Sequence, residues 1–152
     1  MEHVTVKDLV LGSGGVLVSG SEEAPVSHIR LDSRQVEPGD LFVPLLGERV
    51  DSHRFLPQVM DQGAAAVLTS QELTLPEGGA GCAVIRVEDT KKALQKIGSY
   101  LRDRLTLPLV GVTGSVGKTT TREMIAAALS ARFRVYKTPG NSNSQVGVPV
   151  TL

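Results

Sequence analysis

The spacing of apolar positions predicts a mixed α/β protein, because short apolar runs alternate with segments of helical periodicity. Runs bounded by glycine, proline or polar residues predict strands at residues 14–20, 27–32, 39–47, 64–70, 82–87, 107–113 and 134–138. The run at 107–113, LPLVGVT, is almost entirely apolar. Such a run is typical of a parallel strand buried on both faces.

Three segments have the apolar spacing of helices. In the first, Leu56, Val59 and Met60 share one face, and Asp51 or Ser52 can cap its start. The second begins at Asp89 or Thr90 and the third covers residues 117–131. The beginning of the chain reads as short strands and turns, and residues 139–152 as a loop that turns into a helix.

This order of elements predicts two α/β domains. We place the boundary near Val87, so that residues 1–87 form a small domain and residues 88–152 begin a second. The second contains a helix, a strand, a loop, a helix and a strand, which is the opening of a parallel-sheet nucleotide-binding domain. We expect that domain to be incomplete, with Val148, Val150 and Leu152 as core residues that lack a partner.

Composition narrows the possible partners. The 152 residues are 41% apolar, and 16 basic side chains balance 16 acidic ones. Zero formal charge gives no bulk attraction to nucleic acid, and no apolar run is long enough to cross a membrane. We see no signal peptide, and Cys82 is the only cysteine, which fits a reducing cytoplasm. We expect its thiol to be small, buried and unreactive.

The stretch VGVTGSVGKTTTREM, from Val110 to Met124, has the features of a phosphate-binding loop that opens a helix. The strict pattern needs a glycine at position 112, where this chain has Val112. The chemistry is present nevertheless. Gly114 and Gly117 allow close approach of backbone N–H groups to an anion, and the helix N-terminus favours negative charge. Lys118 can reach the β- and γ-phosphates, and the Thr119 hydroxyl can bind Mg²⁺.

The catalytic groups after this loop are few. Phosphoryl transfer normally needs a second metal ligand, usually a carboxylate on a later strand. Glu123 is the only acid after Lys118 and lies on the helix of the loop itself. The chain can therefore hold phosphates but lacks the groups to use them efficiently.

Three stretches carry a resemblance to a known family. TGSVGKTTTREM (Thr113–Met124) resembles the T-G-x-x-G-K-[TS] ATP loop of the Mur ligase family. The segment Leu31–Leu68 resembles the uridine-binding domain shared by its E and F types. TPGNSNSQVGVPVTL (Thr138–Leu152) resembles a segment of the F type. The resemblance runs from about residue 28 to the end of the chain.

The resemblance implies an ATP- and Mg²⁺-dependent ligase of peptidoglycan precursor synthesis. Such an enzyme joins D-alanyl-D-alanine to UDP-N-acetylmuramoyl-tripeptide through an acyl phosphate. It implies that Lys118 is catalytic and that Thr119 binds the metal ion. The implied ATP-binding residues are Gly114, Ser115, Val116, Gly117, Lys118, Thr119 and Thr120. The implied substrate-binding residues are Ser33, Arg34, Arg49, His53, Asn141, Asn143 and Ser144, the last of which replaces the family's usual asparagine.

Simpler roles for these residues stay open. Asp32 and Ser33 can form a turn, and Arg34 can pair with Asp40 or Glu37 on the surface. His53 can be solvated, and Asn141 and Asn143 can be turn formers.

Other functions also stay open. The chain could be a non-catalytic nucleotide or UDP-sugar module, an E-type or polyglutamate ligase, or an unrelated phosphate-loop NTPase. We expect a cytoplasmic monomer with no nucleic-acid partner, and we expect these 152 residues alone to have no ligase activity.

Overall fold

The computed structural model describes residues 4–47, 51–73 and 81–138. Within these residues, five strands form one sheet in the order β1-β5-β4-β3-β2. The strands are β1 (Val16–Ser19), β2 (Ile29–Arg30), β3 (Leu41–Phe42), β4 (Ala66–Thr69) and β5 (Ala83–Arg86). Strands β2 to β5 pair in parallel, and β1 pairs antiparallel with β5. The α/β prediction is confirmed, and five of the predicted apolar runs contain these strands.

Helices and 3-10 turns connect and follow the strands. They are α1 (Val6–Ser13), η1 (Ser33–Gln35), η2 (Ser52–Phe55), α2 (Leu56–Asp61), α3 (Thr90–Arg104) and α4 (Lys118–Ser130). The prediction of strands and turns at the beginning of the chain is wrong for α1. Thr5 and Asp8 form a capping box at its start, and Gly14 ends it in the left-handed region with φ 70°.

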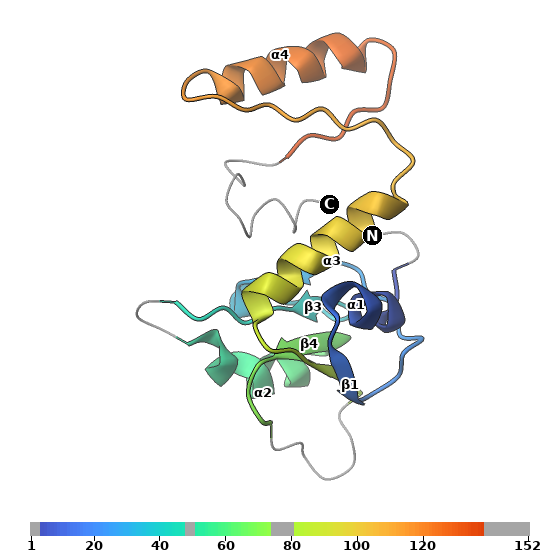
Figure 1. Ribbon diagram of the computed structural model, residues 1–152, viewed down its shortest axis with the longest axis vertical. Coiled ribbons are helices and arrows are strands. Elements are labelled where there is room, and N and C mark those ends of the chain that lie inside the picture. Colours follow the sequence, from blue (N-terminus) through green and yellow to red (C-terminus); the bar gives the residue numbers. More distant parts are fainter. Residues whose placement is uncertain (1–3, 48–50, 74–80, 139–152) are drawn as a thin grey trace.

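One apolar cluster lies on each face of the sheet. Successive strand residues point to opposite faces, so Leu41, Leu68 and Ile85 pack with α1 and α3, while Phe42 and Val67 pack with α2. Figure 1 shows α1 and α3 together on one side of the sheet and α2 on the other. The sheet therefore has helices on both faces, as a parallel sheet requires.

The predictions of strands at residues 107–113 and 134–138 are wrong. Both segments lack strand structure, and Leu107, Val110 and Tyr136 are 66%, 62% and 77% exposed. A strand forms only where a neighbour accepts and donates its backbone hydrogen bonds. No strand of the described chain pairs with either segment.

Helix α4 confirms the predicted third helix but lies apart from the sheet, beyond the end of α3 (Figure 1). It buries Ala126 and leaves Met124 and Leu129 exposed. The domain boundary near Val87 stays a prediction; α3 packs against α1 and the sheet. In the part of the chain that the structure describes, no helix is long and apolar enough to cross a membrane.

The thiol of Cys82 is enclosed in the cluster beneath α2, as predicted. It is 2% exposed, and desolvation by burial raises its pKa to about 12. Since the thiolate is the reactive form, we expect no alkylation by iodoacetamide at pH 8 in the folded chain. Reaction should begin only in denaturant, and mass spectrometry of the intact chain measures this. Rapid labelling of the folded protein would contradict the burial of this thiol.

Candidate functional site

Polar side chains gather where the parallel strands β2, β3 and β4 end. The carboxyl ends of parallel strands lie along the same edge of a sheet, and ligands of open α/β sheets bind outside that edge. The segment after β2 carries Ser33 and Arg34, the segment after β3 leads to Asp51 and His53, and Ser70 follows β4 directly. We call this edge the carboxyl edge.

The turn after β2 is organised by Asp32. Its carboxylate caps η1 by accepting a hydrogen bond from the Arg34 N–H at 3.0 Å. The Arg34 guanidinium donates to both carboxylate oxygens, at 2.9 and 2.6 Å. Arg34 therefore pairs with Asp32, and not with Asp40 or Glu37 as the sequence left open. These hydrogen bonds lower the pKa of Asp32 to about 2. Ser33 is buried, whereas the Arg34 side chain is 84% exposed.

Asp40 lies in the turn before β3, at the amino end of that strand and so opposite the carboxyl edge. Its carboxylate is 1% exposed and accepts hydrogen bonds from Arg30 Nε at 2.9 Å and from the Glu37 N–H at 3.1 Å. His28 Nδ1 lies 3.1 Å from the other oxygen. Burial raises the pKa of Asp40, but these hydrogen bonds outweigh it and the pKa is lowered. Arg30, not Arg34, is therefore the partner of Asp40.

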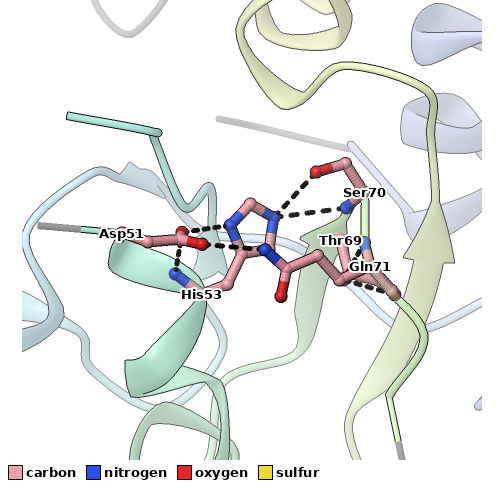
Figure 2. Close-up of polar contacts among 5 residues, drawn as sticks. All are labelled: Asp51, His53, Thr69, Ser70 and Gln71. Atoms are coloured by element: carbon pink, nitrogen blue, oxygen red, sulfur yellow. Dashed lines mark hydrogen bonds and ion pairs between the residues drawn. The ribbon is translucent and has the colours of Figure 1, made fainter. Parts of the chain in front are cut away.

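His53 is buried at the carboxyl edge, which rules out the solvated imidazole that the sequence left open as an alternative. Its side chain is 3% exposed. Nδ1 lies 2.6 Å from Asp51 Oδ1, and Nε2 accepts a hydrogen bond from the Ser70 N–H at 3.2 Å. Figure 2 shows the ring between Asp51 on one side and Ser70 on the other. Asp51 caps the 3-10 helix η2, since its carboxylate accepts from the His53 N–H at 3.0 Å, whereas the N-cap of α2 is Phe55.

Ser70 and Gln71 were not among the predicted site residues. Gln71 Nε2 donates to Asp51 Oδ2 at 2.8 Å, and the Ser70 hydroxyl lies 3.1 Å from His53 Nε2. Their position could have revealed them, because they are the first polar residues after a fully buried strand. Residues at that position face the ligand side of a parallel sheet.

The phosphate-loop residues precede and open α4. Gly114 and Gly117 have φ of 146° and 78°, conformations that favour glycine. A Cβ on Gly117 would meet no atom within 4 Å, so its backbone is open to an approaching group. Gly117 is the N-cap, and the helix begins at Lys118. The first helical bond runs from the Thr121 N–H to the Gly117 carbonyl at 2.9 Å.

Lys118 folds back over this loop. Its ammonium donates to the Gly114 carbonyl at 2.5 Å. The charge therefore lies above the loop, beside the N–H groups that begin a 13-residue helix. The residues Ser115, Val116, Thr119 and Thr120 are exposed around it. This donor set, a lysine ammonium with helix N–H groups and a hydroxyl, suits a polyphosphate.

Thr119 is the candidate metal ligand of this loop. A single hydroxyl is a partial set for Mg²⁺, which completes six oxygens with water and substrate phosphates. Glu123, further along α4, is held by Arg122 at 2.9 Å and by Lys137. Hydrogen bonds from Lys137 and then Arg122 lower the pKa of Glu123, so its carboxylate is paired in this arrangement.

Four predicted substrate residues lie outside the described residues. They are Arg49, Asn141, Asn143 and Ser144. Val148, Val150 and Leu152, expected to be core residues, lie there too. Ser33, Arg34 and His53 lie on the carboxyl edge, while the ATP-loop residues lie at the start of α4.

Comparison with known families defines the class. Residues 25–102, just over half of the chain, match the Mur ligase family, catalytic domain. Residues 112–152 match the Mur ligase middle domain. The chain belongs to the Mur ligase family.

The curated relatives and solved structures that are similar to this chain are of one type within the family. UDP-N-acetylmuramoyl-tripeptide--D-alanyl-D-alanine ligase of Synechocystis is 48% identical over 87% of this chain, and that of Bacillus subtilis is 42% identical over 97%. A crystal structure of MurF from Acinetobacter baumannii matches 97% of the chain with a TM-score of 0.84 and 34% identity. MurF from Thermotoga maritima in complex with ADP matches 83% with a TM-score of 0.71 and 32% identity.

The alignments cover only part of each relative. The chain spans 29% of the Synechocystis protein and 32% of the Bacillus subtilis protein. It spans 32% of the Acinetobacter baumannii structure and 28% of the Thermotoga maritima one.

Proposed function

We propose that this chain supplies the sugar-nucleotide and ATP-phosphate binding parts of an ATP-dependent ligase. The ligase joins D-alanyl-D-alanine to UDP-N-acetylmuramoyl-tripeptide during peptidoglycan precursor synthesis. The names of the relatives at 42–48% identity support the two substrates. Use of ATP and a UDP-sugar favours a cytoplasmic enzyme, and we propose that the chain is monomeric.

The phosphate loop carries this proposal. The Lys118 ammonium donates to the Gly114 carbonyl at the start of α4, in a loop that lacks the strict glycine pattern. A carboxylate is a poor electrophile, so the tripeptide carboxylate must first take the γ-phosphoryl group of ATP, with ADP as the leaving group. The amine of D-alanyl-D-alanine then attacks the acyl carbon, and phosphate leaves as the amide forms.

The residues of this chain hold the reactants for these steps. The Lys118 ammonium and the helix N–H groups are placed to bind β- and γ-phosphate oxygens and to stabilise charge during transfer. Mg²⁺, when bound through the Thr119 hydroxyl, would neutralise charge on the phosphates. Ser33 and Arg34 contribute to the sugar-nucleotide side at the carboxyl edge.

Isothermal titration of the chain with UDP-N-acetylmuramoyl-tripeptide tests the proposal. We expect saturable binding that free UDP displaces and that does not require ATP, because the carboxyl edge and the phosphate loop belong to different parts of the fold. D-alanyl-D-alanine alone serves as a matched negative ligand. Absence of binding by the UDP-sugar peptide would contradict the proposed function.

A further inference from the structure

Asp51, His53, Ser70 and Gln71 form a polar network, which we call the edge clamp, at the carboxyl edge (Figure 2). Asp51 Oδ1 faces His53 Nδ1, and Asp51 Oδ2 accepts from Gln71 Nε2. His53 Nε2 faces both the N–H and the hydroxyl of Ser70. His53 thus contacts Ser70, which lies 17 positions later in the sequence.

The backbone contact settles which ring nitrogen carries the proton. The Ser70 N–H can only donate, so His53 Nε2 must accept at 3.2 Å with its lone pair. A neutral imidazole then has its proton on Nδ1, which donates to Asp51 Oδ1 at 2.6 Å. Both nitrogens are occupied by protein groups, and a ring that is 3% exposed has no donor or acceptor left for a ligand.

The edge clamp joins two of the segments that form the carboxyl edge. In the segment after β3, Leu46 and Asp51 form an isolated antiparallel β-bridge, and the Ser52 N–H donates to the Leu45 carbonyl at 3.2 Å. Ser70 and Gln71 leave β4, where the Thr69 hydroxyl donates to the Gln71 carbonyl at 2.9 Å. His53 ties this segment to the exit of β4 through Ser70, and the hydrogen bond from Gln71 to Asp51 makes a second connection.

We propose that His53 is a positioning residue for the sugar nucleotide and not one of its ligands. Together with Gln71 it fixes Asp51 to the exit of β4 and so holds the carboxyl edge in the form that accepts the UDP-sugar beside the buried Ser33. This inference rests on the proposed function. It revises the role that the sequence resemblance implies for His53.

Nitrogen NMR of the imidazole tests the geometric half of the proposal. Long-range ¹H–¹⁵N spectra of the chain should show a neutral ring with a protonated Nδ1 and an unprotonated Nε2. Saturation with UDP-N-acetylmuramoyl-tripeptide should leave both nitrogen shifts in place. A change of tautomer or charge on binding would overturn the proposal, because it would mean that the ring contacts the ligand.

Variants test the positioning half. We expect His53→Ala to weaken binding of UDP-N-acetylmuramoyl-tripeptide by about tenfold, since the Ser70 N–H loses its acceptor and Asp51 Oδ1 loses the imidazole donor. Asp51→Asn keeps an oxygen that accepts from Nδ1, so its affinity should stay within about threefold of wild type. Asp51→Ala should resemble His53→Ala, and the double variant should lose no more than either single one.

Asp8→Ala is the matched control for lost stability. Asp8 caps α1 by accepting from the Thr5 N–H at 3.0 Å and contacts Arg104 on α3, away from the carboxyl edge. Measured well below its melting temperature, this variant should bind the UDP-sugar peptide as wild type does. Equal affinity of His53→Ala and wild type would overturn the positioning role alone. A wild-type chain that does not bind would instead overturn the proposed function and this role together.

Discussion

We expect Asp40→Ala to lower the free energy of unfolding by about 3 kcal/mol, the largest stability effect of any single substitution that we predict. Removal of this buried carboxylate leaves the Arg30 guanidinium and the Glu37 N–H without their acceptor. Both groups hold the turn between β2 and β3, so the connection between these two strands is weakened. Urea denaturation followed by circular dichroism measures the change.

The exposed Asp61 at the end of α2 provides the control for Asp40. Asp61→Ala should change stability by no more than about 0.5 kcal/mol. A loss at Asp40 as small as that at Asp61 would contradict the importance of the buried network.

The loss at Asp40 should also depend on pH. The pKa of Asp40 in the folded chain is below its ordinary value of 3.8. A carboxyl with a lowered pKa stabilises the fold above its unfolded pKa, and this contribution disappears as the pH falls through the folded pKa. The difference between wild type and Asp40→Ala should therefore be largest at neutral pH and should shrink below about pH 4.

We expect Lys118→Ala to weaken ATP binding by about 2 kcal/mol, or roughly thirtyfold, because it removes the charged donor above the phosphate loop. The fold should be unaffected, since the hydrogen bond that the ammonium makes in the described part of the chain is to the exposed Gly114 carbonyl. Fluorescent ATP analogue titration gives the affinity, and the melting temperature gives the stability.

Lys91→Ala is the matched control for Lys118. It removes an exposed lysine from the first turn of α3, and it should leave ATP affinity unchanged. If the Lys118 and Lys91 variants bound ATP alike, the phosphate-loop assignment would be wrong.

Much of the first sheet could be predicted from the sequence because its strands are short, apolar and bounded by turn residues. Leu68 and Ile85, for example, lie in runs whose burial on both faces follows from apolar character alone. Helix α1 was not predicted because Val4 and Val6 are β-branched, and such residues favour strands. Its formation depends instead on the capping contacts of Thr5 and Asp8.

The run at 107–113 shows where periodicity fails. Its apolar residues predict a buried strand. Burial depends on neighbouring strands, however, and a local sequence pattern carries no information about them. The side chains of Leu107 and Val110 are exposed instead.

The candidate site divides in the same way. The phosphate loop is local in sequence, so Gly117 and Lys118 could be placed at the start of a helix from the sequence alone. The partners of Arg34 and His53 could not. Arg34 pairs with Asp32, two residues away, and the partner of His53 Nε2 is Ser70, which follows β4 and lies 17 positions later in the sequence.

Amide NMR can show whether one chain carries two separate ligand sites. We would record ¹H–¹⁵N spectra of the chain during separate titrations with UDP-N-acetylmuramoyl-tripeptide and with Mg-ATP. We expect the first ligand to shift amides after β2, β3 and β4, including Ser33 and Ser70. The second should shift amides of Gly114 to Thr120. Shifts from both ligands in the same amides, or none in the loop with ATP, would contradict the presence of two separate sites.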